Sequence, residues 1–224
     1  MCFSMTASFG SGVVLGAIGV VTLKITKKPA HLVFAAVPIL FAIQQISEGF
    51  VWLTLQNPDY AKWQSIPIHI FMVFAHIVWP FWITLAALLF EEKKGIRKEI
   101  LSVLFGLAIL LSASEIYYMT IIPITAEVSG HHVKYLFDYP ETYVTITNIV
   151  YGLVTIVPCF LSSVKRMWLL GICFTVSVAF SALFYQAFLL SVWCFFAAIL
   201  SLIIYSIIAN HQKLDKLIST LKPQ

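Results

Sequence analysis

The stretch FAAVPILFAIQQISEGFVWLTL, residues 34–55, carries a single charged side chain, that of Glu48. About 20 consecutive apolar residues are enough for an α-helix to cross the hydrocarbon core of a bilayer. The whole chain has a similar character, because 60% of its 224 residues are hydrophobic and only 11% are charged. A soluble domain has about 25% charged residues. The sequence therefore predicts an integral membrane protein, with residues 34–55 inside one of its spans.

Hydropathy divides the rest of the chain into similar segments, separated by links that contain proline, glycine and charged residues. We predict an all-α fold, a polytopic bundle of seven transmembrane helices over residues 1–209, followed by a short cytoplasmic tail over residues 210–224. The stretch FSALFYQAF, residues 180–188, has almost no polar linker, which predicts a tight turn between the last two spans. The predicted spans are Ser8–Ile25, Leu32–Gln56, Ser65–Phe90, Ile100–Ile122, Tyr143–Val164, Met167–Tyr185 and Gln186–Ile208.

The lysines and arginines are distributed unevenly over the two sides of this bundle. Twelve of the 14 fall in the tail and in the links after the first, third and fifth spans, and only Lys62 and Lys134 fall on the other side. Basic residues concentrate on the cytoplasmic side of membrane proteins. We therefore predict an external N-terminus and a cytoplasmic C-terminus. These loops account for the net charge of +4, so the charge gives no reason to expect a nucleic-acid partner.

The first span contains Gly10, Gly12, Gly16 and Gly19. Small residues allow two transmembrane helices to approach closely, and close packing drives helix association in lipid. The first span is therefore predicted to pack tightly against a neighbouring helix.

Polar side chains form a layer in the outer half of the predicted bundle. Counting 1.5 Å per residue from the outer ends of the helices places them roughly 8–16 Å below the surface. They come from five different spans, so a bundle can bring them to one pocket. The residues are Glu48, His76, Glu115, Asn148 and Cys194.

The two glutamates define the chemistry of this layer. A charged residue at the centre of a transmembrane helix costs about 2.5–3.5 kcal/mol even on insertion scales, and such residues mark functional sites. No lysine or arginine is placed inside a span where it can pair with Glu48 or Glu115. The acids are then either protonated, paired with histidine or bound to a cation. With His76 they form an N/O ligand set suited to zinc or iron, which we favour over proton chemistry.

Several further residues are secondary candidates for metal binding. Cys194 is more simply explained as a small apolar residue. His69 is seven residues from His76, about 10 Å along a helix, so the two cannot bind one ion and His69 is better placed near the outer opening. The loop pair His131 and His132 can cap the pocket or collect a metal. Cys2 gains a chelating amine if Met1 is removed.

Other side chains are expected to support the site. Gln44 and Gln45 lie one helical turn below Glu48 and can orient its carboxyl group, and Asn148 is a second candidate for that role. Aromatic side chains near the same depth are expected to form walls for a lipid-like or small-molecule ligand, although an interfacial belt explains them equally well. The wall residues are Trp52, Trp79, Tyr118 and Trp193.

The opening MCFSMTASF, the segment IQQISEGFVWL and the late segment SVWCFFAAILS resemble an uncharacterised family of prokaryotic seven-span membrane proteins. The resemblance extends over essentially the whole chain. It implies the seven-span architecture and a bacterial inner-membrane location, and it implies no activity. Retinal proteins require a lysine in the last span, which residues 186–208 lack, so retinal is excluded. A bis-His haem is disfavoured, because only the third span has deep histidines.

Two hypotheses of function follow, with a third left open. In the first, a metal site serves a metal-binding protein or a metal-dependent membrane enzyme such as an intramembrane hydrolase. In the second, Glu48 and Glu115 carry protons in a proton-coupled transporter of small solutes. Prolines near the spans favour the second hypothesis, and the confinement of the polar layer to the outer half counts against it. The third is a ligand receptor or an assembly subunit, and the oligomeric state is not predicted.

Overall fold

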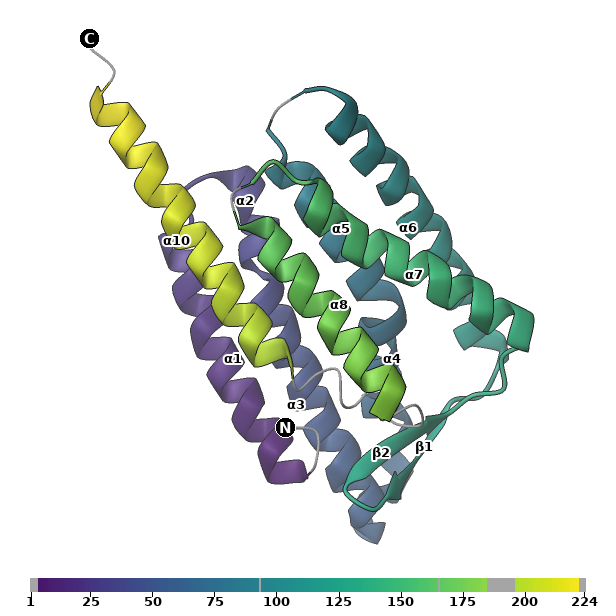
Figure 1. The fold of residues 1–224 in the computed structure, drawn as a ribbon. Helices are drawn as coiled ribbons and strands as arrows, with labels where there is room; N and C mark the ends of the chain where they lie inside the picture. The colour runs from purple at the N-terminus through teal and green to yellow at the C-terminus, as the bar shows by residue number, and fades with distance from the viewer. Residues whose placement is uncertain (1–3, 93, 165, 185–195, 222–224) are drawn as a thin grey trace.

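The computed structural model describes residues 4–92, 94–164, 166–184 and 196–221. The chain folds into a bundle in which successive helical spans alternate in direction, with a small β-hairpin at one end (Figure 1). In chain order the elements are α1 Met5–Ile25, α2 Pro29–Ala35, α3 Val37–Gln56, η1 Pro58–Trp63, α4 Ser65–Val73, η2 Phe74–Val78, α5 Trp79–Phe90, α6 Ile96–Ile121, β1 Thr125–Ser129, β2 His132–Leu136, α7 Glu141–Leu161, α8 Met167–Phe184 and α10 Ala197–Leu221.

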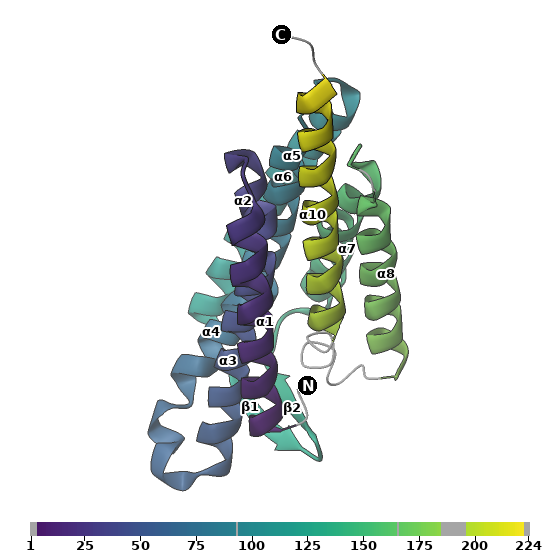
Figure 2. The same cartoon turned by 90° about the vertical axis from the view of Figure 1, so that its left-hand side faces the viewer.

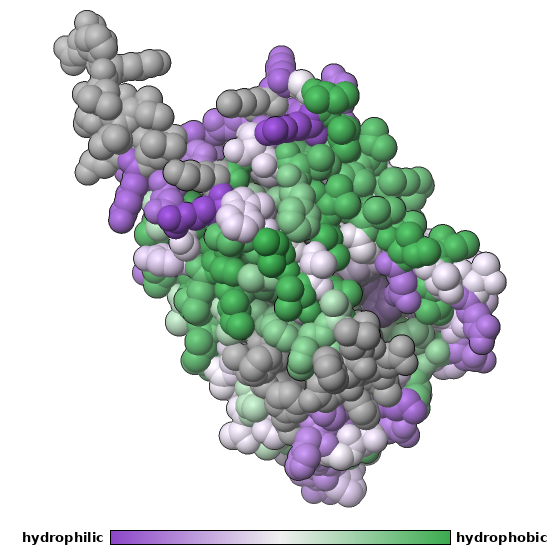
Figure 3. All heavy atoms as spheres, viewed as in Figure 1, coloured by the Kyte–Doolittle hydropathy of each residue, from purple (hydrophilic) through white to green (hydrophobic). Residues whose placement is uncertain are grey.

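Five segments of the described chain are long and apolar enough to cross a membrane, which confirms the first five predicted spans to within a few residues. They are Met5–Ile25, Pro29–Gln56, Ser65–Phe90, Ile96–Ile121 and Glu141–Leu161. A shorter apolar helical segment, Met167–Phe180, follows them in α8. Many large apolar side chains are exposed on these helices. An apolar surface separates hydrophilic regions at the two ends of the molecule (Figure 3), as expected for a protein embedded in lipid.

The last predicted spans are described only in part. The turn predicted at residues 180–188 and the first half of the predicted seventh span fall largely on residues 185–195, outside the described residues. From Ala197 onward, α10 runs without a break to Leu221, through the boundary predicted between bundle and tail at residue 209. It lies beside α1 and runs in the same direction, so α1 starts and α10 ends at opposite ends of the bundle (Figure 2).

The predicted close packing of the first span is confirmed, and its partner is α3. A Cβ atom on Gly12 would lie 2.7 Å from Ile46 Cγ1, and one on Gly19 would lie 2.6 Å from Ile39 Cδ1. From the other side, a Cβ on Gly49 would meet the Phe9 ring at 2.7 Å. Glycine is therefore required at these contacts, whereas Gly10 has open space around it.

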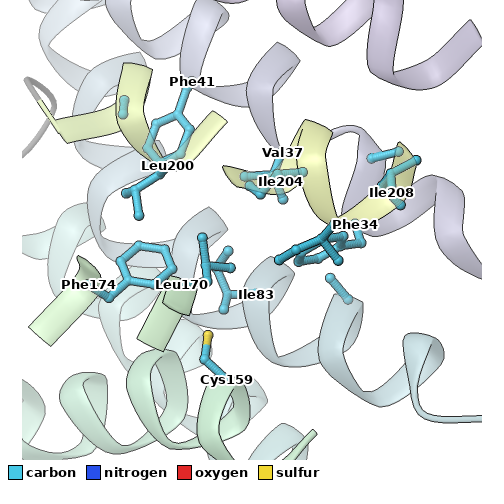
Figure 4. Packing of buried hydrophobic residues seen from close by; sticks show 14 of the residues in the cluster. Phe34, Val37, Phe41, Ile83, Cys159, Leu170, Phe174, Leu200, Ile204 and Ile208 are labelled. Carbon is cyan, nitrogen blue, oxygen red and sulfur yellow. The ribbon is translucent and has the colours of Figure 1, made fainter. Parts of the chain in front are cut away.

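Two apolar clusters hold the bundle together. The inner cluster joins α2, α3, α5, α8 and α10 around side chains such as Phe34, Ile83, Leu170 and Ile204 (Figure 4). The outer cluster joins α3 and α4 to the hairpin, with Tyr135 stacked on Phe71 at 4.6 Å between ring centroids. One continuous predicted span, Ser65–Phe90, contributes to both clusters, through α4 to the outer one and through α5 to the inner one.

The all-α fold is confirmed, with one small addition: the link between α6 and α7 forms a short β-hairpin. Strands β1 and β2 pair antiparallel, from Thr125 opposite Leu136 to Ser129 opposite His132. Gly130 opens the two-residue turn with φ +62°, a backbone region that glycine adopts without strain. Val133 and Tyr135 face the helices and are buried, so their period-two spacing attaches the hairpin to the bundle.

Candidate functional site

The structure brings two of the three predicted metal ligands together. His76 Nδ1 lies 3.2 Å from Glu115 Oε2, which makes this pair an ion pair when the imidazole is protonated. The Glu115 side chain is 3% exposed and that of His76 is 19% exposed. His76 comes from η2 and Glu115 from the last third of α6, and these two elements lie side by side. The pair therefore places a titratable base next to a buried acid inside the bundle.

His76 belongs to a π-helical turn, η2, inserted between α4 and α5. The N–H of Trp79 donates to the carbonyl of Phe74, five residues earlier, as in a π-helix. Pro80 follows directly and has no N–H to continue the ladder. Single π turns occur frequently at functional sites. This turn sets the direction of the His76 side chain.

A tyrosine completes the polar contacts of Glu115. The Tyr143 hydroxyl on α7 donates to Glu115 Oε1 at 3.0 Å and lies 3.0 Å from Ser114 Oγ. Each carboxylate oxygen thus faces a different partner, Tyr143 on one side and His76 on the other. The three groups come from three separate elements, η2, α6 and α7. We call His76, Glu115 and Tyr143 the acid–imidazole site.

Aromatic rings cover this site on the side that faces the hairpin. Tyr118 packs on Tyr143 with ring centroids 3.9 Å apart, and Tyr139 lies 5.4 Å from Tyr118. Phe137, at the end of the hairpin, contacts the His76 ring edge to face at 5.7 Å. The end of the hairpin therefore packs against the site through Phe137.

Three buried polar atoms in the site or beside it are not hydrogen-bonded within the described part of the chain. They are His76 Nε2, Glu115 Oε2 and the Tyr139 hydroxyl. Glu115 Oε2 is at ion-pair distance from His76 but not aligned for a hydrogen bond. Burial raises the pKa of Tyr139, and the nearby Glu115 carboxylate raises it further. The phenol therefore stays protonated and available as a donor.

Glu48 lies in a different polar cluster, between α1 and α3. Gln45 Nε2 donates to Glu48 Oε2 at 3.4 Å, and Ser11 Oγ donates to Gln45 Oε1 at 2.8 Å. All three residues are buried, Glu48 completely. Within the described residues, no three His, Cys, Asp or Glu side chains are grouped closely enough to hold a metal ion. The predicted set of Glu48, His76 and Glu115 is therefore not one ligand group in this structure.

The predicted supporting residues separate in the same way. Gln45 orients Glu48 as expected, but Gln44 accepts a hydrogen bond of 2.7 Å from Trp79 Nε1 instead. Asn148 lies on the exposed side of α7. His69 is partly exposed on α4, and its Nδ1 lies 2.7 Å from the carbonyl of Ser65 in the preceding turn of its own helix.

Among the predicted wall residues, Tyr118 contacts the acid–imidazole site directly through Tyr143. Trp52 is buried in the outer cluster, and Trp79 is buried against Phe41 in the inner cluster. Trp193, Cys194 and Cys2 lie outside the described residues.

The two loop histidines occupy the hairpin. His131 is in the turn and is exposed, and His132 begins β2. Burial and the neighbouring His131 lower the pKa of His132. Both histidines therefore lie at the turn of the hairpin and are not part of the acid–imidazole site.

Sequence reasoning missed a second set of charged contacts, at the opposite end of the bundle from the hairpin. Glu92 Oε1 lies 2.9 Å from Lys28 Nζ and 3.2 Å from His31 Nε2. The Lys28 hydrogen bond lowers the pKa of Glu92. The His31 ring also contacts the His211 ring on α10, with centroids 4.8 Å apart. These residues were treated only as parts of basic links.

Glu91 belongs to the same end of the bundle. Its two carboxylate oxygens accept hydrogen bonds of 2.6 Å from the Ser163 N–H and hydroxyl. Glu91 is 1% exposed. These contacts fix the end of α5 to the link between α7 and α8.

The long apolar helices, the exposed apolar surface and the buried acid–imidazole site define a class of protein, an integral multi-pass membrane protein. Within that class, the chain belongs to the family described as "family of unknown function (DUF6629)", whose model matches residues 1–217. This match agrees with the resemblance to an uncharacterised membrane protein family. No curated protein and no solved structure matches the chain.

Proposed function

We propose that the acid–imidazole site binds and releases a proton and is the coupling site of a proton-coupled transporter of small solutes. One observation carries the proposal: a buried carboxylate faces an imidazole at 3.2 Å and a phenol at 3.0 Å. An unpaired carboxylate would be costly at this depth. One proton on the pair makes it electrically neutral, whereas loss of that proton leaves a net negative charge. Release of the proton is therefore favoured only when water or another cation reaches the site.

Hydroxyl groups extend from this site toward the other end of the bundle. On α7, Tyr143 and Tyr151 are partly buried, and Thr155, one turn beyond Tyr151 on the same face, is buried. The Thr84 hydroxyl on α5 lies 2.7 Å from the carbonyl of Val154 on that α7 segment. These groups weaken the argument that the inner half of the bundle has no polar residues, and they support a transport function.

The expected orientation puts the acid–imidazole site nearer the external surface. Lys134 is the only lysine or arginine in the sequence of the hairpin, which packs against the site. Lys28 and Lys98 belong to the opposite end, with most of the basic residues. We propose an external N-terminus, a cytoplasmic C-terminus and seven membrane crossings. Labelling of single cysteines placed in the hairpin turn and in the link at residue 95, with a membrane-impermeant reagent, tests this orientation.

Infrared difference spectroscopy in lipid nanodiscs tests the proton site. A change of pH should produce a carboxyl protonation signal that is lost in Glu115→Gln and altered in His76→Gln. Glu48→Gln is the matched control, because it removes a buried carboxylate of the same type from the other cluster. A signal that survives Glu115→Gln contradicts the proposal.

A metal-binding function is the second candidate, and it rests on His76 alone. A metal-bound histidine commonly donates its other ring N–H to a carboxylate. His76 has this arrangement, with Nδ1 toward Glu115 and Nε2 buried without a hydrogen bond among the described residues. Zinc or iron bound at Nε2 would activate water for a hydrolase, as in the metal-dependent enzyme hypothesis.

Elemental analysis of protein purified without chelators separates the two candidates. The proton site predicts the same metal content in the parent protein and in the Glu48→Ala, His76→Ala and Glu115→Ala variants. If the parent protein binds metal stoichiometrically and only His76→Ala and Glu115→Ala lose it, the metal-binding function is supported and the proton-coupled function is contradicted.

A further inference from the structure

The π turn that carries His76 is stabilised by two hydroxyl groups from other helices. The Tyr151 hydroxyl on α7 donates to the carbonyl of Ala75 at 3.0 Å. The Ser112 hydroxyl on α6 donates to the carbonyl of Ile77 at 3.2 Å. These two carbonyls flank His76 in the sequence, so both neighbouring helices bind the backbone on either side of the imidazole.

Pro80 explains why the Ala75 carbonyl needs an external donor. In a π-helical ladder, the N–H of residue 80 would donate to the carbonyl of residue 75, but proline has no N–H. A buried carbonyl without a donor destabilises the fold, because its lost contact with water is not replaced. Tyr151 supplies the missing donor. Loss of its hydroxyl therefore removes the partner that stabilises this carbonyl in the π turn.

The π turn also determines which way His76 points. A π turn adds one residue to the helix, and each residue of an α-helix turns the side chain by about 100°. The α4 segment before the turn is held by the outer cluster, and α5 after it by the inner cluster. A change in the π turn therefore cannot be absorbed by free rotation of either segment, and it moves the His76 ring relative to Glu115.

We infer that Tyr151 and Ser112 are positioning residues for the acid–imidazole site. Through these two bonds they hold the backbone of the π turn, so that Nδ1 of His76 faces Glu115 and Nε2 remains the proton-accepting atom. The importance of this positioning for transport rests on the proposed function. The effect of the two residues on the His76 ring does not depend on that function.

A matched control comes from α7 and α5, the helix that contains Pro80. Pro158 interrupts α7 as Pro80 interrupts the other helix, and it leaves the Val154 carbonyl without its N–H donor four residues later. The Thr84 hydroxyl of α5 lies 2.7 Å from that carbonyl, and it shares its single hydrogen with the Pro80 carbonyl, also at 2.7 Å. Each helix thus supplies a hydroxyl to the carbonyl that the other helix's proline leaves without a donor. Thr84→Val removes a comparable bond that does not support the carbonyls flanking His76.

The tautomer of His76 tests the inference. The neutral ring is expected to hold its proton on Nδ1, toward Glu115, because the partner of one ring nitrogen decides where the proton resides. Nitrogen NMR of ¹⁵N-histidine-labelled protein in nanodiscs reads this directly, and His76→Gln assigns the signal among the six histidines. Tyr151→Phe and Ser112→Ala should each replace the Nδ1-protonated signal by a mixture of both tautomers. Thr84→Val should leave it unchanged.

The outcomes separate this inference from the proposed function. An unchanged tautomer in folded Tyr151→Phe and Ser112→Ala proteins overturns the positioning role, and so does an equal change in Thr84→Val. If the tautomer responds as expected while the infrared signal of Glu115 is absent, the positioning role stands and the proton-coupled function fails.

Discussion

Glu48 and Glu115 are both buried glutamates in transmembrane helices, yet their surroundings differ in kind. The Gln45 amide donates to Glu48, at an interface of α1 and α3 where glycines allow contacts too close for a Cβ. Glu115 faces an imidazole and a phenol from two other elements, next to a π turn and under a hairpin. An amide does not exchange protons near neutral pH, whereas an imidazole does. Among the described contacts, this difference favours Glu115 over Glu48 as the proton-binding group of the proposed function.

The largest expected difference between the two clusters is in transport. Proteoliposomes with an imposed pH gradient, screened against a panel of small solutes, should show uptake that falls to the level of empty liposomes in Glu115→Gln. Glu48→Gln should keep most of the parent rate once the amount of folded protein is matched. Equal loss in both variants would remove the distinction between the clusters.

The next effect concerns the close packing of α1 against α3, the interface that also contains Glu48. Gly19→Ala would place a Cβ 2.6 Å from Ile39 Cδ1 and 2.9 Å from the Ile39 backbone nitrogen. Overpacking of this kind costs typically about 1–3 kcal/mol. Thermal unfolding in detergent should therefore show a lower midpoint for Gly19→Ala, while Gly10→Ala, which meets no atom within 4 Å, should leave the midpoint unchanged. Equal midpoints for the two variants would contradict the close approach of α1 to α3.

A similar loss of stability is expected from Gln44, which lies beside Gln45 in sequence but serves another partner. Gln44→Leu leaves Trp79 Nε1 buried without its acceptor, which costs about 1–3 kcal/mol. The double variant Gln44→Leu with Trp79→Phe removes both partners and should recover part of the loss. Lack of any recovery would mean that the cost of Gln44→Leu does not come from the Trp79 contact.

The smallest expected effect is at the opposite end of the bundle, where Lys28 pairs with Glu92. The pKa of Glu92 is lowered mainly by the Lys28 hydrogen bond, so the ionised pair stabilises the fold above the ordinary glutamate pKa of 4.5. Its contribution is lost as the pH falls through the lowered pKa. Because Glu92 is half exposed, Lys28→Met should cost less than about 1 kcal/mol at pH 7.

A pH series of unfolding midpoints checks this last prediction. The difference between Lys28→Met and the parent should be present at neutral pH, and should vanish in acid below the lowered pKa of Glu92. A difference that persists in acid would show that Lys28 acts through packing of its alkyl chain instead.

Sequence reasoning predicted the first five spans well, because long apolar runs follow from the thickness of the bilayer alone. Depth along each helix was equally accessible, and it selected His76 and Glu115, which the structure brings together. Depth does not give the direction around the helix axis. That direction separates Glu48 from Glu115, and Gln44 from Gln45, and it depends on which helices pack against each other.

Other features depend on contacts between distant residues. The π turn has one local signal, Pro80, but its stabilisation requires Tyr151, 76 residues after Ala75 in the chain. The hairpin has short strands whose burial comes from α3 and α4, so its alternating pattern was weak in isolation. The ion pairs of Glu92 join two links that were each described only as basic.

The most direct test of the central claim is a pH series of ¹⁵N-histidine NMR spectra of the protein in nanodiscs, followed for His76 in the parent, Glu115→Gln and Glu48→Gln proteins. The proton site predicts that the His76 ring signals change with pH in the parent, that Glu115→Gln alters this dependence, and that Glu48→Gln preserves it. His76 signals that stay constant from pH 4 to pH 9 in the parent, or that respond equally to both variants, would contradict it.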